Sequence, residues 1–114
     1  MKFWAPLLAW MGFISYCSSI PASSIPPLFP YQDVVYHFCA YLALALLFGR
    51  AILGQGRELT FPRFVFFVLM FGTLYGIIDE FHQSFVPGRS STLFDASVDA
   101  LGSLVGGLFY RWQR

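Results

Sequence analysis

Long apolar runs separated by short polar segments make up most of this chain of 114 residues. Four runs approach the roughly 20 residues that an α-helix needs to cross about 30 Å of hydrocarbon. Prolines, glycines and serines, which favour turns and irregular structure, fill the segments between them. The pattern predicts an all-α fold, an integral membrane four-helix bundle that forms one domain over residues 1–114. We place the spans at about residues 3–20, 34–53, 61–83 and 94–112.

The composition favours a membrane protein over a soluble one. Hydrophobic residues make up 57% of the chain and charged residues 11%, against about 25% charged residues in ordinary soluble domains. The mean hydropathy is +0.63. A net charge of +1 with no basic stripe argues against a nucleic-acid partner. Cys17 and Cys39 lie in separate apolar runs, so we expect them to be buried and unpaired.

The basic residues predict the orientation, because cytoplasmic loops of membrane proteins carry an excess of lysine and arginine. Arg89 is the basic residue that falls in the segments after the first and third spans. We therefore expect both termini and the middle linker to lie in the cytoplasm. The six basic residues on that side are Lys2, Arg50, Arg57, Arg63, Arg111 and Arg114.

A cleaved signal peptide is the alternative for the first apolar run, because a lysine precedes it and small residues follow it. Trp4 and Trp10 suit a retained membrane helix better. We expect the first run to stay in the protein.

The stretch from Ile77 to Asp99 holds four of the six carboxylates of the chain. If the third helix runs through Gln83, then Asp79, His82 and Gln83 share one face at spacings i, i+3 and i+4. Glu80 is turned away from Asp79 by about 100°. Pro87 and Gly88 are expected to follow the end of this helix.

The second and fourth spans carry matching polar faces. Asp95 and Asp99 are four residues apart, and Gly102 and Gly106 continue the same helical face. Glycines at this spacing let two helices approach closely, so the acidic face should point into the bundle. In the second span, a further polar face is formed at spacings of four residues by Asp33, His37 and Tyr41.

Three helices thus present polar groups at the same predicted depth, and together they predict an outward-facing pocket. Ionisable groups inside a membrane are rare and usually functional. Helix capping by Asp33 and simple core packing by Tyr41 stay open as alternatives. The hypothetical catalytic residues are Asp79, Glu80, His82 and Asp99. The hypothetical ligand-binding residues are Arg89, Gln83, His37, Tyr41, Asp33 and Asp95.

Two kinds of chemistry fit these residue types. Acid–histidine pairs can transfer protons, and Arg89 can bind a phosphate or carboxylate group. Aspartate, glutamate and histidine can also hold a divalent metal, but the sequence has no compact ligand motif, so this signal is weak. The cofactor, if there is one, stays unknown.

Three segments, "DEFHQSFVPGR", "DASVDALGSLVGG" and "DVVYHFCAYLALALL", resemble those of the VanZ-like membrane proteins. The resemblance covers nearly the whole chain and implies four spans in the same order, in a bacterial cytoplasmic membrane. The bias of the basic residues predicts that the polar motif faces outside. The founding member of that family is associated with low-level resistance to teicoplanin, a lipoglycopeptide. Two positions differ from the family pattern, since Val34 follows Asp33 where lysine is usual and Asp99 stands where asparagine is frequent.

The polar residues are predicted to lie at the depth of lipid headgroups, so we expect a ligand from the membrane. The main hypothesis is a protein that binds a lipid-linked anionic envelope molecule, such as a cell-wall precursor, with a link to glycopeptide resistance or envelope maintenance. The alternatives are a membrane-embedded hydrolase or transferase acting on a lipid-linked phosphate headgroup, and a small carrier. Membrane lipids are the expected partners, and a homo-oligomer stays open.

Overall fold

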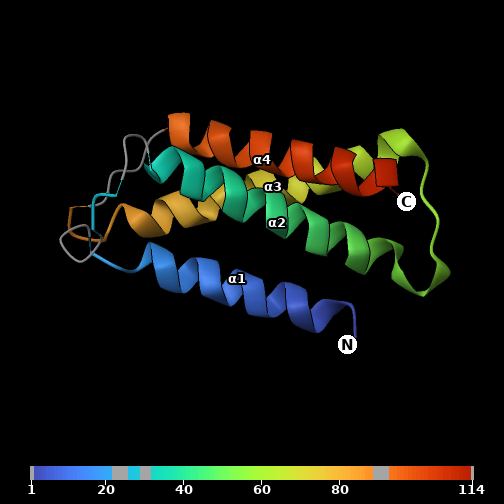
Figure 1. The fold of residues 1–114 in the computed structure, drawn as a ribbon, viewed down its shortest axis with the longest axis horizontal. Coiled ribbons are helices and arrows are strands. Elements are labelled where there is room, and N and C mark those ends of the chain that lie inside the picture. Colours follow the sequence, from blue (N-terminus) through green and yellow to red (C-terminus); the bar gives the residue numbers. More distant parts are fainter. Residues whose placement is uncertain (1, 22–25, 29–31, 89–92, 114) are drawn as a thin grey trace.

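The computed structural model describes residues 2–21, 26–28, 32–88 and 93–113, and the regular structure of these residues is helical throughout (Figure 1). The predicted all-α fold is confirmed, and each predicted span lies within two residues of the helix bounds. A short 3₁₀ helix, η2 (Gly54–Gly56), follows the second α-helix. The α-helices are α1 (Trp4–Ser18), α2 (Gln32–Leu53), α3 (Phe61–Gln83) and α4 (Leu93–Gln113).

Prolines and glycines account for the boundaries of α3. Thr60, with φ −64° and ψ 157°, is extended and precedes the helix, and Pro62 lies in the first turn. Proline is favoured there because its missing N–H would have no helical partner. After the helix ends, Gly88 adopts a φ of 75°, a left-handed conformation that glycine tolerates without steric strain. The predicted stop near Pro87 and Gly88 is therefore confirmed.

The four helices run alternately up and down, and both ends of the chain lie at the same end of the bundle (Figure 1). The beginnings of α1 and α3 and the ends of α2 and α4 share this end, which we call the basic end. The opposite end, which we call the polar end, carries the last turns of α1 and α3 and the first turns of α2 and α4. The basic residues in or beside the helix turns at the basic end are Lys2, Arg50, Arg57, Arg63 and Arg111.

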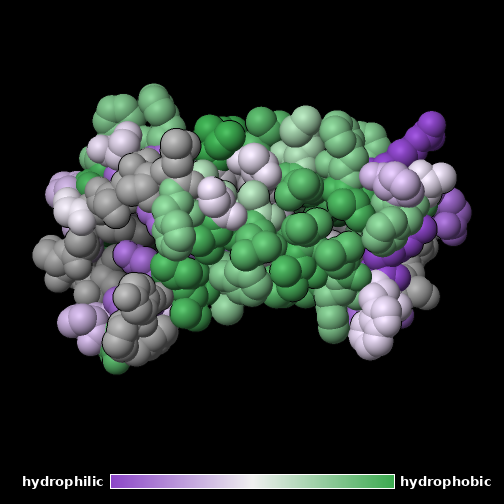
Figure 2. All heavy atoms as spheres, turned by 90° about the horizontal axis from the view of Figure 1, so that it is seen from above, coloured by the Kyte–Doolittle hydropathy of each residue, from purple (hydrophilic) through white to green (hydrophobic). Residues whose placement is uncertain are grey.

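Apolar side chains form a wide band between two more hydrophilic ends on the face shown in Figure 2. The molecule is 45 Å long, so it exceeds the roughly 30 Å of a hydrocarbon core. Two helices, α2 and α3, are long and apolar enough to cross a membrane. The structure therefore supports two of the four predicted spans. The helix α1 has only 15 residues, and α4 carries two carboxylates near its start.

The helix α4 packs closely against α2 through glycines, as the sequence predicts. A Cβ atom on Gly102 would lie 2.6 Å from the backbone oxygen of Phe38, and one on Gly106 would collide with the backbone oxygen of Leu42. The two pairs have the same spacing of four residues, so the two helices meet along a shared ridge. The acidic face of α4 consequently points into the bundle.

The helix α1 packs against α2 and α3 and, among the described helices, does not contact α4. Trp10 Nε1 donates a hydrogen bond of 2.9 Å to the backbone oxygen of Ala40, which attaches α1 to α2. The Tyr75 hydroxyl donates one of 2.7 Å to the backbone oxygen of Met11, which attaches α1 to α3. Cys17 on α1 is half-buried, Cys39 on α2 is exposed, and neither forms a disulfide. The expectation that both are buried is therefore wrong for Cys39.

Candidate functional site

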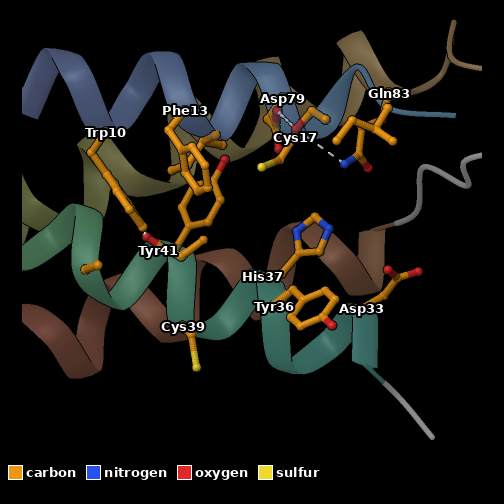
Figure 3. Close-up of a pocket in the computed structure, with 15 residues that line it drawn as sticks. Trp10, Phe13, Cys17, Asp33, Tyr36, His37, Cys39, Tyr41, Asp79 and Gln83 are labelled. Atoms are coloured by element: carbon orange, nitrogen blue, oxygen red, sulfur yellow. Dashed lines mark hydrogen bonds between the residues drawn. The ribbon is translucent and has the colours of Figure 1, made fainter. Parts of the chain in front are cut away.

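A cavity of about 480 Å³ lies between α1 and α2 and reaches α3 at the polar end; we call it the groove. Aromatic and aliphatic side chains cover most of its wall, and polar side chains gather at one end (Figure 3). An apolar cavity with a few convergent polar groups is the usual form of a ligand site. The apolar lining includes Trp10, Phe13, Ile14, Cys17, Ile20, Tyr36, Ala40 and Ala43, and the polar lining includes Ser18, Asp33, His37, Tyr41, Asp79 and Gln83.

Hydrogen bonds between α1 and α3 fix one wall of the polar end. Ser18 donates a hydrogen bond to Asp79 Oδ1, and Gln83 Nε2 donates one of 3.4 Å to Ser18 Oγ (Figure 3). All three side chains are buried. Asp79 and Gln83 are four residues apart on α3, so one helical face carries both toward α1.

His37 of α2 points across the groove toward Asp79 and Gln83 (Figure 3). Its Nδ1 lies 2.8 Å from Asp99 Oδ1 on α4 and 3.7 Å from Glu80 Oε1 on α3. When Nδ1 carries a proton, it donates a hydrogen bond to Asp99 Oδ1. Three helices therefore contribute to a single buried group of ionisable side chains. We call His37, Asp79, Glu80 and Asp99 the His37 cluster.

Glycines on α3 make room for this cluster. A Cβ atom on Gly76 would lie 3.0 Å from both Cβ and Oδ2 of Asp99, and one on Gly72 would collide with Ser103. Gly72 and Gly76 have the same spacing as Asp99 and Ser103. Because these glycines have no side chains, the polar face of α4 can pack directly against the backbone of α3. The Ser103 hydroxyl donates to the backbone oxygen of Asp99 at 3.0 Å.

Asp99 Oδ2 is buried and has no hydrogen bond within the described part of the chain, in a residue that is 0% exposed. The Tyr41 hydroxyl, in a residue that is 1% exposed, has no hydrogen bond of good geometry but interacts with Asp79. Leaving a buried polar atom without a partner costs about 1–3 kcal/mol. Such atoms are uncommon in native proteins, so Asp99 Oδ2 suggests that the region is arranged around a further component.

The His37 cluster contains the residues that could hold a metal ion. Each of its four members offers one ligand atom, and these atoms all lie within 4.8 Å of one another. Carboxylate oxygens and imidazole nitrogen are suitable donors for divalent metals. The cluster also pairs an imidazole with a carboxylate, which can hold or move a proton.

The structure brings seven of the ten predicted site residues to the groove or the His37 cluster. Asp33 lies exposed at the rim of the groove, and Asp95 is half-buried at the start of α4, outside both. His82 is exposed, and its Nε2 contacts Ser19 Oγ at 2.8 Å. Arg89 lies outside the described residues. The seven residues are His37, Tyr41, Asp79, Gln83 and Asp33 in the groove and Glu80 and Asp99 in the cluster.

The placement of His82 with Asp79 and Gln83 on one buried face is wrong. The buried face of α3 is centred on Gly76, Asp79, Glu80 and Gln83, so Glu80 points inward. His82 precedes Gln83 by one residue and is turned from it by about 100°, which carries it to the surface.

Ser18, Gly72 and Gly76 were not predicted from the sequence as residues of the site, although the sequence contains a feature that points to each of them. Ser18 ends the first apolar run beside another serine, at the predicted depth of the acids. Gly72 and Gly76 repeat the four-residue spacing that identified the packing face of α4.

In a comparison with protein families, the VanZ/LLP1 family model matches residues 3–114. No match was found among curated proteins or among solved structures. The matched range includes every helix of the bundle and every described residue of the groove and the His37 cluster.

Proposed function

The chain belongs to the VanZ/LLP1 family, and from this premise we propose that it binds a lipid-linked anionic envelope molecule in its groove. The protein would act in a bacterial cytoplasmic membrane. Its apolar band and the two helices α2 and α3, which are able to span a membrane, support that location (Figure 2).

The groove is the observation that carries the proposal. A volume of about 480 Å³ is within the range of about 300–1,000 Å³ that is typical of small-molecule sites. An amphiphile fits its two-part wall, with a chain along Trp10, Phe13 and Ala43 and a headgroup beside His37 and Asp79. A soluble polar molecule would leave most of this apolar wall unused.

We extend the proposal to four spans, with both termini in the cytoplasm and the polar end outside. The basic residues at the basic end support this orientation, because positive residues are retained on the cytoplasmic side. A reporter active only in the cytoplasm and one active only outside would be fused in turn to the C-terminus. Activity of the outside reporter alone would contradict the orientation.

The biological role follows from the ligand class. A protein that holds a lipid-linked cell-wall precursor at the outer surface would support envelope maintenance or reduce access of a glycopeptide such as teicoplanin. The polar end faces that surface in the proposed orientation. Binding of this precursor by the protein would then change the resistance of the cell to the glycopeptide.

A second candidate function is hydrolysis or group transfer on a lipid-linked phosphate headgroup. The observation that favours it is the His37–Asp99 contact of 2.8 Å, since His37 also lines the groove. A buried carboxylate that orients an imidazole is a common arrangement for a general base. The first function predicts ligand that is retained unchanged, and the second predicts a product.

Filling the groove tests the binding proposal. The protein would be extracted in a mild detergent, and the lipids it retains would be quantified by native mass spectrometry. Ala43→Phe places a ring in the groove, and we expect roughly 5–150-fold weaker lipid retention, because overpacking a filled site costs about 1–3 kcal/mol. Val35→Phe, at an exposed position of α2 outside the groove, is the matched control.

Equal retention by the two variants and the unchanged protein would refute the proposal. To separate the two functions, the retained lipid would be incubated in two separate reactions, one with the unchanged protein and one with an Asp99→Asn variant. A product that forms only with the unchanged protein indicates an enzyme, and an unchanged lipid in both indicates a binder.

A further inference from the structure

We propose that the His37 cluster binds one divalent transition-metal ion, of the class of Mn²⁺, Fe²⁺ or Zn²⁺. The site would be formed by one imidazole and three carboxylates from α2, α3 and α4. The ion itself does not depend on the proposed lipid ligand. Its suggested contact with a headgroup, described below, rests on the proposed function.

The distances within the cluster are close to those of a coordination shell. Metal–ligand bonds of about 2.0–2.2 Å place the ligand atoms of a tetrahedral site about 3.4 Å apart. His37 Nδ1 lies 2.8 Å from Asp99 Oδ1 and 3.7 Å from Glu80 Oε1, and all ligand atoms of the cluster lie within 4.8 Å of one another. Side-chain rotations that move atoms by about 1 Å would therefore complete the shell.

The charges of the cluster favour a cation. His37 can supply at most one positive charge, whereas its three partners can carry three negative charges. All four side chains are buried, and buried carboxylates repel one another strongly because the surroundings screen charge poorly. A divalent ion in the middle replaces this repulsion with attraction for each carboxylate.

The buried oxygen Asp99 Oδ2 is an independent sign of a missing partner. Asp99 is 0% exposed, its Oδ1 contacts His37, and its Oδ2 has no hydrogen bond. Oδ2 lies against Gly76, on the α3 side of the carboxylate, where Asp79 and Glu80 also reach the cluster. A bound ion would supply the partner that this oxygen lacks.

The donor set indicates the class of metal. Ca²⁺ and Mg²⁺ prefer shells made of oxygen, whereas a mixture of imidazole and carboxylates suits Mn²⁺, Fe²⁺ and Zn²⁺. His37 and Asp79 also line the groove, so the ion would lie at its polar end. An anionic headgroup could bind there through an oxygen on the metal, which explains how an acidic site could hold an anion.

Metal content and cobalt spectra test the proposal on the full chain in detergent. The purified protein would be stripped with a chelator, dialysed against Zn²⁺ or Co²⁺ and analysed for bound metal. We expect about one ion per chain, and visible absorption bands of Co²⁺ bound to nitrogen and oxygen ligands. Affinity should rise with pH, because metal binding displaces protons from the ligands.

Single substitutions assign the ion to the cluster. Asp99→Asn keeps the size of the side chain and should weaken Zn²⁺ binding by at least about 100-fold, since loss of an outer-shell partner alone costs about 10–100-fold. Glu58→Gln, a carboxylate near the basic end, should leave affinity unchanged and is the matched control. Circular dichroism and elution as a single species would check folding, and Glu80→Gln would replace a variant that fails this check.

Either of two results would overturn the proposal. One is an unchanged protein that binds no ion and gives no cobalt bands; the other is equal affinity in the cluster variants and in the control. The lipid measurement on Ala43→Phe uses no added metal, so the two proposals can fail separately.

Discussion

Substitution of Gly102 by alanine is predicted to separate α4 from α2 and to destabilise the protein. The added Cβ atom would lie 2.6 Å from the backbone oxygen of Phe38, whereas ordinary contact begins at 3.4 Å. The helices must therefore move apart by about 0.8 Å, because the obstacle is backbone and cannot rotate away. The same shift would lengthen the His37–Asp99 contact from 2.8 Å to about 3.6 Å, beyond hydrogen-bonding distance.

The expected loss of stability combines two opposing effects. Overpacking of this kind costs about 1–3 kcal/mol, and a backbone obstacle places Gly102→Ala in the upper half of that range. Replacing glycine by alanine in a helix contributes about 1 kcal/mol in the other direction. The net loss in the free energy of unfolding is about 1–2 kcal/mol, or roughly 5–30-fold in the ratio of folded to unfolded protein.

Gly12→Ala is the control for this prediction, because a Cβ atom on Gly12 would meet nothing within 4 Å. It should raise stability by up to about 1 kcal/mol through helix propensity alone. Both variants would be unfolded reversibly in mixed micelles by increasing sodium dodecyl sulfate, with helicity as the signal. If Gly102→Ala proves as stable as Gly12→Ala, the close α2–α4 contact described above is incorrect.

Three further substitutions probe the attachment of α1 and the limits of the site. Trp10→Phe removes the hydrogen bond to Ala40 and should lower the free energy of unfolding by about 1 kcal/mol in the same micelle assay; no change would mean that this bond does not hold α1. His82→Ala alters an exposed side chain, so stability should change by less than about 0.5 kcal/mol and Zn²⁺ affinity should stay the same; loss of affinity would place His82 in the site. Tyr41→Phe removes a buried hydroxyl that has no hydrogen bond of good geometry, so the lipid-free and metal-free protein should be as stable as before or more stable by up to about 1 kcal/mol. A clear loss of stability would show that the interaction of this hydroxyl with Asp79 stabilises the fold.

Helical spacing was sufficient to predict the fold and part of the candidate site. The spacing of Asp95, Asp99, Gly102 and Gly106 identified the buried face of α4, because two glycines four residues apart have few uses other than close packing. The apolar runs gave helix bounds close to those observed. These features are local, so they can be read along a single helix.

Features that depend on how helices rotate against one another could not be predicted in this way. The rotation of α3 buries Glu80 and exposes His82, and a shift of about 100° would have exchanged their places. The groove lies between α1, α2 and α3, and no residue pattern in α1 indicates which helices it contacts. Periodicity shows which residues share a face, but the partner of that face is decided by tertiary packing.

The short length of α1 has a consequence for the proposed membrane arrangement. With 15 residues at about 1.5 Å each, α1 is about 22 Å long, roughly 8 Å less than a typical hydrocarbon core. A bilayer adapts to a short helix by thinning locally, at a cost of fractions of a kcal/mol per ångström of mismatch. Inserted in a bilayer, the protein would therefore thin the leaflet beside α1, and a lipid headgroup would reach the polar end of the groove with little vertical displacement.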